Sequence, residues 1–277
     1  MKIERRPLAD LTTLGVGGEA EIWTVETPTD LLKATQAPFR VLGNGSNLLV
    51  SDHGVSERVI RLSGDFAAAN LGRPRNPTHI TPWLGAGSLL PNLVREARQK
   101  GLTGLEPLFG IPASLGGAVR MNAGTRFGEI ADVLEAVEIF HNGAFYIFYP
   151  DELGFTYRHS NLPPNSIVTR VRLRLGKDDP SKIEARMRQV DEARQGQPKR
   201  KSAGCAFKNP VDDSAGRLID QAGFKGMRAG GAMISREHGN FVINTGGANA
   251  ADIWELIKRV QEKLPLELEW EVWGKIP

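Results

Sequence analysis

GIPASLGGAVRMNAG at residues 110–124 is the stretch that decides the fold, because four of its fifteen residues are glycine. Glycine lacks a Cβ atom, so it tolerates positive φ and lets the backbone approach a ligand closely. Loops of this kind can turn backbone N–H groups toward a phosphate. GNGSN at 43–47 and GAGS at 85–88 are two further glycine-rich stretches. Together they predict loops that bind a large nucleotide cofactor, although tight turns alone would explain any single one.

These loops do not match the two common nucleotide fingerprints. Gly43-Asn44-Gly45 lacks the third glycine of the Rossmann pattern, and the apolar run at 48–50 indicates a strand where that pattern needs a helix. The Walker A pattern is absent as well.

Composition limits the class of protein. The chain has 277 residues, of which 40% are hydrophobic and 24% charged, as expected for a water-soluble protein of two or three domains. No apolar stretch approaches the roughly 20 residues needed to span a bilayer, and no N-terminal targeting pattern is present. We therefore expect a cytoplasmic protein without membrane insertion. One cysteine and five scattered histidines predict neither an internal disulfide nor a metal site.

The charge balance is only weakly informative. A net charge of +3 is small for a protein that binds nucleic acid, so we expect no nucleic-acid partner. One basic run stands out, Lys199-Arg200-Lys201. A solvated turn explains it, and a small phosphate site is the functional alternative.

Short strands alternate with helices along the chain. Apolar residues recur at helical spacing over 88–100, 180–194 and 250–263, with Ser88 as N-cap and Gly101 as C-cap of the first helix. GRLIDQAGF indicates a short helix that ends at Gly223. Strands are expected within 13–25, 41–50 and 167–175. A shift to a charged, proline-led segment suggests a domain boundary near Gly176.

A series of motifs, in order, covers nearly the whole chain. They are TLGVGG (13–18), LGNGSNLL (42–49), GIPASLGGAVRMNAG (110–124), FTYRHS (155–160), SAGCAFKNP (202–210), LIDQAGFKG (218–226) and GNFVIN (239–244). With these motifs the chain resembles the UDP-N-acetylenolpyruvoylglucosamine reductases, flavoenzymes of peptidoglycan synthesis in the bacterial cell wall.

The resemblance implies an α+β fold. It combines an FAD-binding fold of the vanillyl-alcohol-oxidase (PCMH) type, in two subdomains, with an α/β substrate domain. The expected boundaries are 1–52 with 265–277 for the first FAD-binding subdomain, 53–176 for the second and 177–264 for the substrate domain. The chain is similar to the shorter subclass, which lacks an additional substrate-covering loop, and we expect a monomer.

The resemblance also implies the reaction. NADPH is the co-substrate that reduces bound FAD, and the flavin reduces the enolpyruvyl ether of a UDP-N-acetylglucosamine derivative to UDP-N-acetylmuramate. Negative charge then builds next to the substrate carboxylate, so a cation and a hydrogen-bonding acid should face that group, and a donor must protonate the carbon.

Motif positions assign the first two catalytic roles. Arg158 in FTYRHS is the expected cation, because guanidinium holds a carboxylate in two places and keeps its charge. In LELEWEVWG three glutamates would share one face of a strand, and the motif register counted from Gly274 selects Glu269 as the acid. For Glu267 and Glu271 a solvent-facing position is expected.

Cys205 stands where the family usually has serine. A thiol, with a pKa of about 8.5 in water, is mostly protonated at neutral pH and can therefore donate a proton. A lone cysteine is otherwise most often a buried apolar residue. The motif favours the proton donor, with the reservation that Lys208 or the 199–201 run would lower the thiol pKa.

The remaining site residues follow from the same motifs. The residues expected to bind FAD are Gly43, Asn44, Gly45, Ser46, Asn47, Gly110, Ile111, Pro112, Ser114, Gly116, Gly117 and Ala118. Those expected to bind the substrate are Tyr157, Lys208, Asn209 and Asn240, although an asparagine could equally cap a turn. Ala113 departs from the family, which commonly has glycine there.

Two alternatives remain open. One is a flavin oxidoreductase of the same fold that oxidises an alcohol, against which the SAGCAFKNP segment argues. The other is a nucleotide- or nucleic-acid-binding module, which predicts no flavin and a salt-sensitive affinity.

Overall fold

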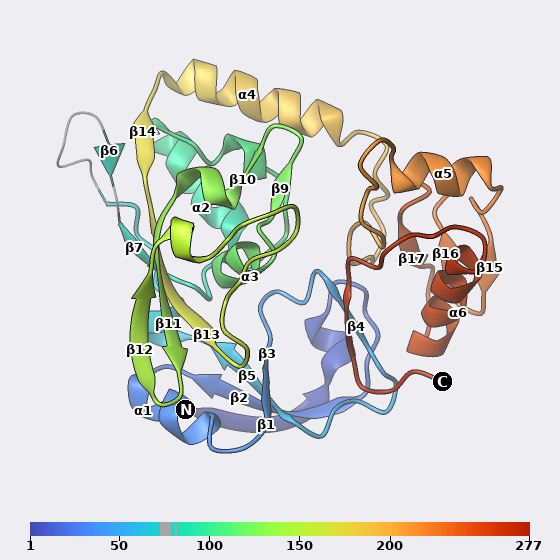
Figure 1. Ribbon diagram of the computed structural model, residues 1–277, viewed down its shortest axis with the longest axis horizontal. Helices are drawn as coiled ribbons and strands as arrows, with labels where there is room; N and C mark the ends of the chain where they lie inside the picture. The colour runs from blue at the N-terminus through green and yellow to red at the C-terminus, as the bar shows by residue number, and fades with distance from the viewer. Residues whose placement is uncertain (73–78, 81) are drawn as a thin grey trace. The chain divides into compact units, whose positions relative to one another are not determined.

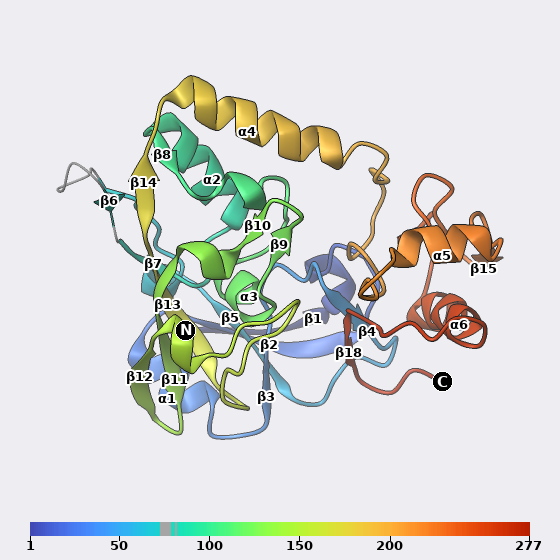
Figure 2. The same cartoon turned by 45° about the horizontal axis from the view of Figure 1, so that its top comes forward.

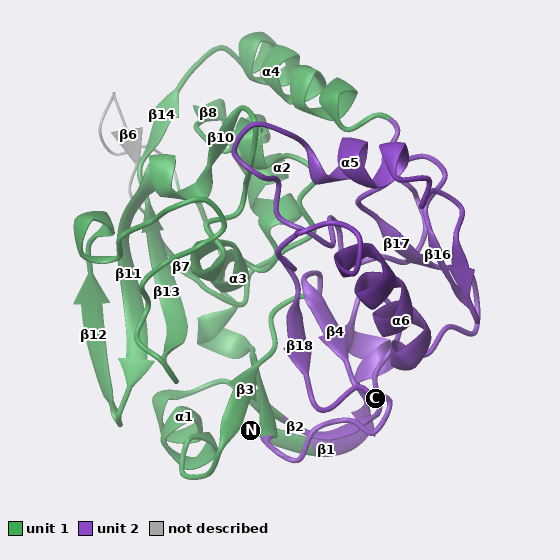
Figure 3. Ribbon diagram, turned by 45° about the vertical axis from the view of Figure 1, so that its right-hand side comes forward, with its two compact units in different colours: residues 1–3, 23–44, 58–195 green, residues 4–22, 45–57, 196–277 purple. Residues whose placement is uncertain are grey.

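The computed structural model describes residues 1–72, 79–80 and 82–277. The chain divides into two compact units, shown in different colours in Figure 3. Unit 1 contains residues 1–3, 23–44 and 58–195, and unit 2 contains residues 4–22, 45–57 and 196–277. Each unit is described by itself.

Strands and helices alternate in both units. The strands are β1 (Lys2–Pro7), β2 (Glu19–Val25), β3 (Phe39–Val41), β4 (Leu48–Val50), β5 (Arg58–Leu62), β6 (His79–Ile80), β7 (Trp83–Gly85), β8 (Leu102–Thr103), β9 (Gly124–Thr125), β10 (Gly128–Glu129), β11 (Leu134–His141), β12 (Ala144–Phe148), β13 (Ile167–Leu173), β14 (Leu175–Lys177), β15 (Arg228–Ala229), β16 (Ala232–Ile234), β17 (Val242–Asn244) and β18 (Glu271–Trp273). The α-helices are α1 (Pro28–Ala34), α2 (Leu90–Gln99), α3 (Leu115–Arg120), α4 (Pro180–Ala193), α5 (Ala215–Gln221) and α6 (Ala250–Gln261). Short 3₁₀ turns are η1 (Leu8–Leu11), η2 (Gly64–Phe66), η3 (Glu106–Leu108), η4 (Ile130–Val133) and η5 (Pro150–Glu152).

The main sheet of unit 1 has the strand order β12-β11-β13-β7 and is antiparallel throughout. Asn142 and Gly143, both with positive φ, form the tight turn between β11 and β12. The central strands β11 and β13 are mostly buried, whereas the edge strand β12 is exposed. The sheet thus forms one side of the hydrophobic core of unit 1.

Helices α2 and α4 lie side by side in unit 1, as Figures 1 and 2 both show. Asp179 accepts a hydrogen bond from the Ser181 N–H as N-cap of α4, and Pro180 fits the first turn because it needs no donor. Ile183, Met187 and Val190 are buried as predicted. The predicted helices at 88–100 and 180–194 are therefore confirmed, with small shifts at their ends.

The predicted N-cap of α2 is wrong. Leu89 is the N-cap residue, and it makes no capping hydrogen bond. The hydroxyl of Ser88 donates instead to the Ala67 carbonyl. Gly101, with φ +63°, follows the C-cap residue Lys100 and provides the left-handed turn that ends the helix.

A second sheet of unit 1, with the order β6-β14-β8, is antiparallel. The strands β3 and β5, which also belong to unit 1, pair parallel in the four-stranded sheet β1-β2-β5-β3. Helix α1 begins with a reciprocal capping box between Thr27 and Asp30, which explains why a seven-residue helix is stable there. Gly176 pairs with Thr103 inside unit 1. The predicted three-part division with a boundary at this residue stays a prediction.

Unit 2 is built on the antiparallel sheet β15-β16-β17 with helices α5 and α6. Asn249 and Asp252 form the capping box that starts α6, and Ile253, Ile257 and Val260 are buried as predicted. Helix α5 is the predicted short helix, and Gly223 follows it with φ +78°.

The C-terminal strand is shorter than the alternation of apolar and acidic residues suggests. Only Glu271–Trp273 form a strand, β18, which pairs parallel with β4 in unit 2. The burial alternation holds nevertheless, because Leu266 and Trp270 are buried while Glu267 and Glu271 are exposed. Among the described residues, no helix is both long and apolar enough to cross a bilayer.

Candidate active site

In unit 1 the loop at 43–44 contacts the glycine-rich loop that opens α3. The side-chain amide of Asn44 donates to the Pro112 carbonyl at 2.7 Å. A Cβ atom on Gly43 would lie 2.4 Å from the Ser114 hydroxyl oxygen, so a larger residue here would force that hydroxyl to turn away. The structure therefore brings together residues that the sequence analysis assigned to one cofactor site.

Hydrogen bonds within the protein hold the start of α3 in place. The N–H groups of Leu115 and Gly116 donate to the carbonyls of Ser88 and Ala86. The Gly117 N–H donates to the Ser114 hydroxyl, which caps the helix. A Cβ on Gly116 would meet the Ala86 Cβ at 2.9 Å, so this glycine allows the GAGS loop to pack closely. Ligand binding by the Gly116 and Gly117 backbones stays a prediction.

Other N–H groups of these two loops are available for a ligand. In the described part of unit 1, the backbone N–H groups of Gly43, Asn44, Gly110, Ala113 and Ser114 have no hydrogen-bond acceptor. The Ser114 hydroxyl adds a donor that can turn toward a ligand. A phosphate or diphosphate accepts such hydrogen bonds, so this cradle fits the diphosphate of a flavin dinucleotide. Gly110 reaches its position with φ +79°.

Arg194 is a residue of this region that sequence reasoning missed. Its guanidinium donates to the Gly110 carbonyl at 3.0 Å, and a Cβ on Gly110 would lie 3.0 Å from its Nε. The contact places a permanent positive charge beside the glycine loop. No motif marks Arg194, because it lies just after α4 and is 84 residues away from Gly110 in the sequence.

The rest of the GNGSN motif lies in unit 2. A Cβ on Gly45, whose φ is +62°, would lie 2.3 Å from the Leu11 carbonyl oxygen, so glycine is required. Asn47 donates through its amide to the Glu269 carbonyl at 3.1 Å, and its own carbonyl accepts from the Glu271 N–H. Asn47 therefore supports the segment that carries a predicted catalytic acid. FAD binding by Gly45, Ser46 and Asn47 stays a prediction.

Arg158 sits at the tip of a two-residue turn in unit 1. Thr156 and His159 exchange two backbone hydrogen bonds, and Arg158 between them has φ +55°. This backbone conformation is strained for a residue with a side chain, and such strain is concentrated at functional sites. The guanidinium donates to the Gly124 carbonyl at 2.8 Å and lies 4.8 Å from the centre of the exposed Tyr157 ring.

Cys205 lies half-buried in unit 2 on a segment held from two sides. On one side Cys205 forms a bridge with Phe241, and the Ala206 N–H donates to the Asn240 carbonyl at 2.8 Å. On the other side the Glu269 N–H donates to the Ala206 carbonyl at 2.8 Å. Cys205 and Glu269 are thus attached to one short strand-like segment, although 64 residues separate them in the sequence.

Asn240 is buried and bonded to the same segment. Its side-chain amide accepts from the Phe207 N–H at 2.9 Å and donates to the Phe207 carbonyl at 2.8 Å. Its backbone N–H donates to Nδ1 of His238 at 3.2 Å. These contacts make Asn240 a positioning residue for Cys205, and direct binding of the substrate by this side chain stays a prediction.

Lys208 and Asn209, two further predicted substrate ligands, also have protein partners. Lys208 makes an ion pair with Glu267 at 2.6 Å, which supplies a counter-charge to the cation nearest Cys205 in the sequence. The Asn209 side chain accepts a hydrogen bond from the Ala215 N–H at the start of α5. This contact is of the turn-capping kind predicted as the alternative for Asn209, and binding of the substrate by Asn209 stays a prediction. Ile111 and Ala118 lie on the glycine-rich loop and on α3 as expected.

Two family models match the chain. "FAD binding domain" matches residues 24–143, which include the cradle of unit 1. "UDP-N-acetylenolpyruvoylglucosamine reductase, C-terminal domain" matches residues 197–273, which include Cys205 and Glu269.

Relatives match along the full length. The chain is 65% identical over 273 residues to the UDP-N-acetylenolpyruvoylglucosamine reductase of a Thermus thermophilus strain, a match that covers 99% of this chain and 100% of the relative. It is 51% identical over 278 residues to the reductase of the same name from Deinococcus radiodurans, covering 98% and 96%. The crystal structure of UDP-N-acetylenolpyruvylglucosamine reductase from Thermus caldophilus matches with a TM-score of 0.94 at 64% identity, covering 99% of this chain and 100% of that one.

Proposed function

This chain belongs to the UDP-N-acetylenolpyruvoylglucosamine reductase family, and we infer that it is the reductase of that name in the synthesis of peptidoglycan precursors. The observation that carries this conclusion is the identity of 65% over 99% of the chain. The predicted family, fold class and enzyme class are thereby confirmed. The chain has an FAD-binding domain of the expected type and the reductase C-terminal domain of a UDP-N-acetylmuramate dehydrogenase that uses NADPH.

Unit 1 contributes the residues that would hold FAD. Bound FAD supplies hydride transfer, from NADPH to the terminal carbon of the substrate's enolpyruvyl group. The N–H groups of Gly43, Asn44 and Ser114 are the donors suited to its diphosphate, because the described protein offers them no other acceptor. Arg194 beside Gly110 adds positive charge for the same group.

Cys205 completes the reduction in this proposal. Addition of hydride to the terminal carbon leaves an electron pair on the neighbouring carbon, which bears the carboxylate. The Cys205 thiol gives its proton to that carbon, a C–H bond forms, and the resulting thiolate regains a proton from water. Arg158 and Glu269 stabilise the carboxylate as charge develops, the first as a cation and the second as a hydrogen-bonding acid.

The substrate is a UDP-sugar, and its recognition by Tyr157, Lys208 and Asn209 is part of the proposal. We further propose a cytoplasmic monomer, since the reaction uses NADPH and a nucleotide-activated sugar. A single sharp sedimentation boundary at the mass of one chain, with FAD bound, would support the monomer.

Two Cys205 variants test the assignment of the proton donor. Cys205→Ser keeps a dissociable proton at the same place and should retain appreciable turnover. Cys205→Ala should slow the oxidation of reduced flavin by the UDP-sugar by about 10²- to 10⁴-fold, while NADPH reduces the flavin at the normal rate. Anaerobic stopped-flow absorbance separates the two half-reactions. An alanine variant that forms product at a near-native rate would rule out Cys205 as the donor.

A further inference from the structure

Unit 2 contains an open cavity of about 400 Å³ that no residue assigned above lines. Its walls are Gly15, Arg200, Lys201 and the loop at 244–248, which includes Gly246 and Gly247. Two cations and several glycines around one cavity form the combination that suits a phosphate. The basic run that the sequence analysis left between a solvated turn and a phosphate site thus borders a cavity.

The two cations of this cavity are uncompensated. In the part of the chain that the structure describes, neither Arg200 nor Lys201 has an ion-pair partner. Lys208, a few residues further along the same segment, has its partner in Glu267. The positive charge of the cavity is therefore available to an anionic ligand.

The position of Lys201 is defined by backbone contacts. Its carbonyl accepts from the Asn244 N–H, and the two residues form a bridge. A Cβ on Gly15 would lie 2.9 Å from Lys201 Cδ and 3.2 Å from its Nζ. The lysine side chain therefore lies directly over Gly15, which also lines the cavity.

The loop at 244–248 adds one free donor. Asn244 accepts from the N–H groups of Gly246 and Ala248 and so shapes the loop, whereas the Gly247 N–H has no acceptor among the described residues. The N-terminus of α6 takes no part, because the Asp52 carboxylate accepts from the N–H groups of Ala250 and Ala251. Asp52 itself does not line the cavity.

The cavity and Cys205 lie along the same pair of segments. Lys201 is bridged to Asn244 and Cys205 to Phe241. Four residues of extended chain span about 13 Å at most. In NADPH and in the UDP-sugar, several bonds separate the phosphates from the reacting atoms. A phosphate site within about 13 Å of the proton donor therefore suits either ligand.

We propose that this cavity binds a phosphate group of a nucleotide ligand of the reaction, through the Arg200 guanidinium, the Lys201 ammonium and the Gly247 N–H. The inference rests on the proposed function for the identity of that ligand. Two sources carry the required chemistry, the 2′-phosphate of NADPH and the diphosphate of the UDP-sugar.

Binding of inorganic pyrophosphate to the purified FAD-loaded protein tests the site without catalysis. We expect Arg200→Gln and Lys201→Gln each to weaken the binding measured by calorimetry by about tenfold. Lys199→Gln is the matched control, since it removes the same charge from the same run but does not line the cavity. At about 0.15 M salt, where the Debye length is about 8 Å, general charge effects are screened.

Steady-state kinetics assign the source of the phosphate. If the ratio of kcat/KM for NADPH to kcat/KM for NADH is about tenfold lower in Arg200→Gln and Lys201→Gln than in the wild type, the cavity binds the 2′-phosphate of NADPH. A comparable rise in the KM for the UDP-sugar, with that ratio unchanged, identifies the diphosphate.

Three results overturn the proposal. The first is pyrophosphate binding that is equal in the wild type and all variants. The second is a Lys199→Gln variant that binds pyrophosphate as weakly as the other two. The third is an unchanged ratio of kcat/KM for NADPH and NADH together with an unchanged KM for the UDP-sugar. A flavin that NADPH does not reduce would instead contradict the proposed function and leave the pyrophosphate result standing.

Discussion

Asn240 is the residue on which the arrangement around Cys205 depends most directly. Its side-chain amide bonds both the N–H and the carbonyl of Phe207, as the backbone of a neighbouring strand would. The sequence suggested a polar residue in a matched motif but not this use of it, because the same amide can bind a ligand or a backbone. Only the fold decides which partner lies within reach.

Asn240→Ala should lower the free energy of unfolding by about 3 kcal/mol, because two buried backbone groups lose their partners. The variant should also slow proton delivery from Cys205 more than flavin reduction by NADPH. Urea unfolding and stopped-flow absorbance measure the two effects. The control is Asn209→Ala, which removes one exposed cap and should cost about 1 kcal/mol or less. Unchanged stability with a raised KM for the UDP-sugar would instead make Asn240 a substrate ligand.

His238 gives the same region a pH dependence. Burial, with a smaller contribution from the positive charge of Lys225, lowers the pKa of His238 below its ordinary value of 6.5. The unfolded chain therefore binds this proton more readily, so the stability from the neutral ring is complete above pH 6.5. It is lost as the pH falls from 6.5 toward the lower pKa of the folded state.

His238→Gln should flatten that pH dependence. The wild-type free energy of unfolding should fall as the pH is lowered below about 6.5, and the fall should be smaller in the variant. His53→Gln, at an exposed histidine, should keep the wild-type slope. Equal slopes in all three proteins would show that His238 is not the group responsible.

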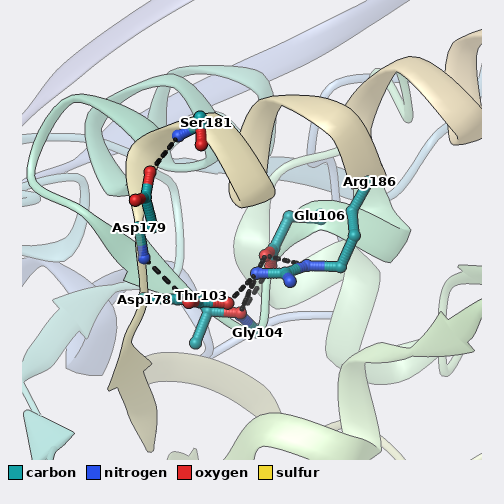
Figure 4. Close-up of polar contacts among 7 residues, drawn as sticks. All are labelled: Thr103, Gly104, Glu106, Asp178, Asp179, Ser181 and Arg186. Atoms are coloured by element: carbon teal, nitrogen blue, oxygen red, sulfur yellow. Dashed lines mark hydrogen bonds and ion pairs between the residues drawn. The ribbon is translucent and has the colours of Figure 1, made fainter.

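Helix α4 is attached to unit 1 through polar contacts as well as through its buried apolar face. Figure 4 shows Arg186 reaching from α4 to Glu106 and Thr103. Glu106 is only 3% exposed, and it also accepts from the Thr103 hydroxyl and the Gly104 N–H. The hydrogen bond from Arg186 lowers the pKa of Asp178, which lies just before the helix. Arg186 thus joins three segments of unit 1.

Arg186→Met should destabilise unit 1 by about 2 to 3 kcal/mol, because the carboxylate of Glu106 stays buried without its cation. Arg98→Met is the matched control, since its ion pair with Glu184 also joins α2 to α4 but both side chains are about half exposed. That change should cost about 1 kcal/mol or less. Thermal or urea unfolding compares them, and equal costs would contradict the special role of the Arg186 contact.

Helices were the elements that the sequence predicted best. The spacing of Ile183, Met187 and Val190, and of the corresponding residues of α6, reports a buried face directly. Shorter elements were harder, since the Glu267–Trp270 segment alternates like a strand yet forms only an isolated bridge through Leu268. Its partner is the Cys205 segment rather than a sheet, and that pairing of distant segments leaves no local pattern.

At the scale of the whole molecule, motif order identified the family and the fold class. It did not place Cys205 and Glu269 together, since the expected boundaries put Cys205 in the substrate domain and Glu269 in the first FAD-binding subdomain, whereas both residues lie in unit 2 and within the match to the C-terminal domain. It did not indicate Arg194 or the loop at 244–248. Neither stands out by residue type. Arg194 is recognised only by its contact with Gly110, and the loop only by its place in the wall of the cavity.

The visible absorption spectrum of the purified protein, recorded anaerobically, tests the central claim most directly. The account predicts an oxidised-flavin band that NADPH bleaches and that the UDP-enolpyruvyl sugar then restores in the absence of oxygen. A colourless protein that cannot be loaded with FAD, or a bleached flavin that the UDP-sugar leaves reduced, would contradict it.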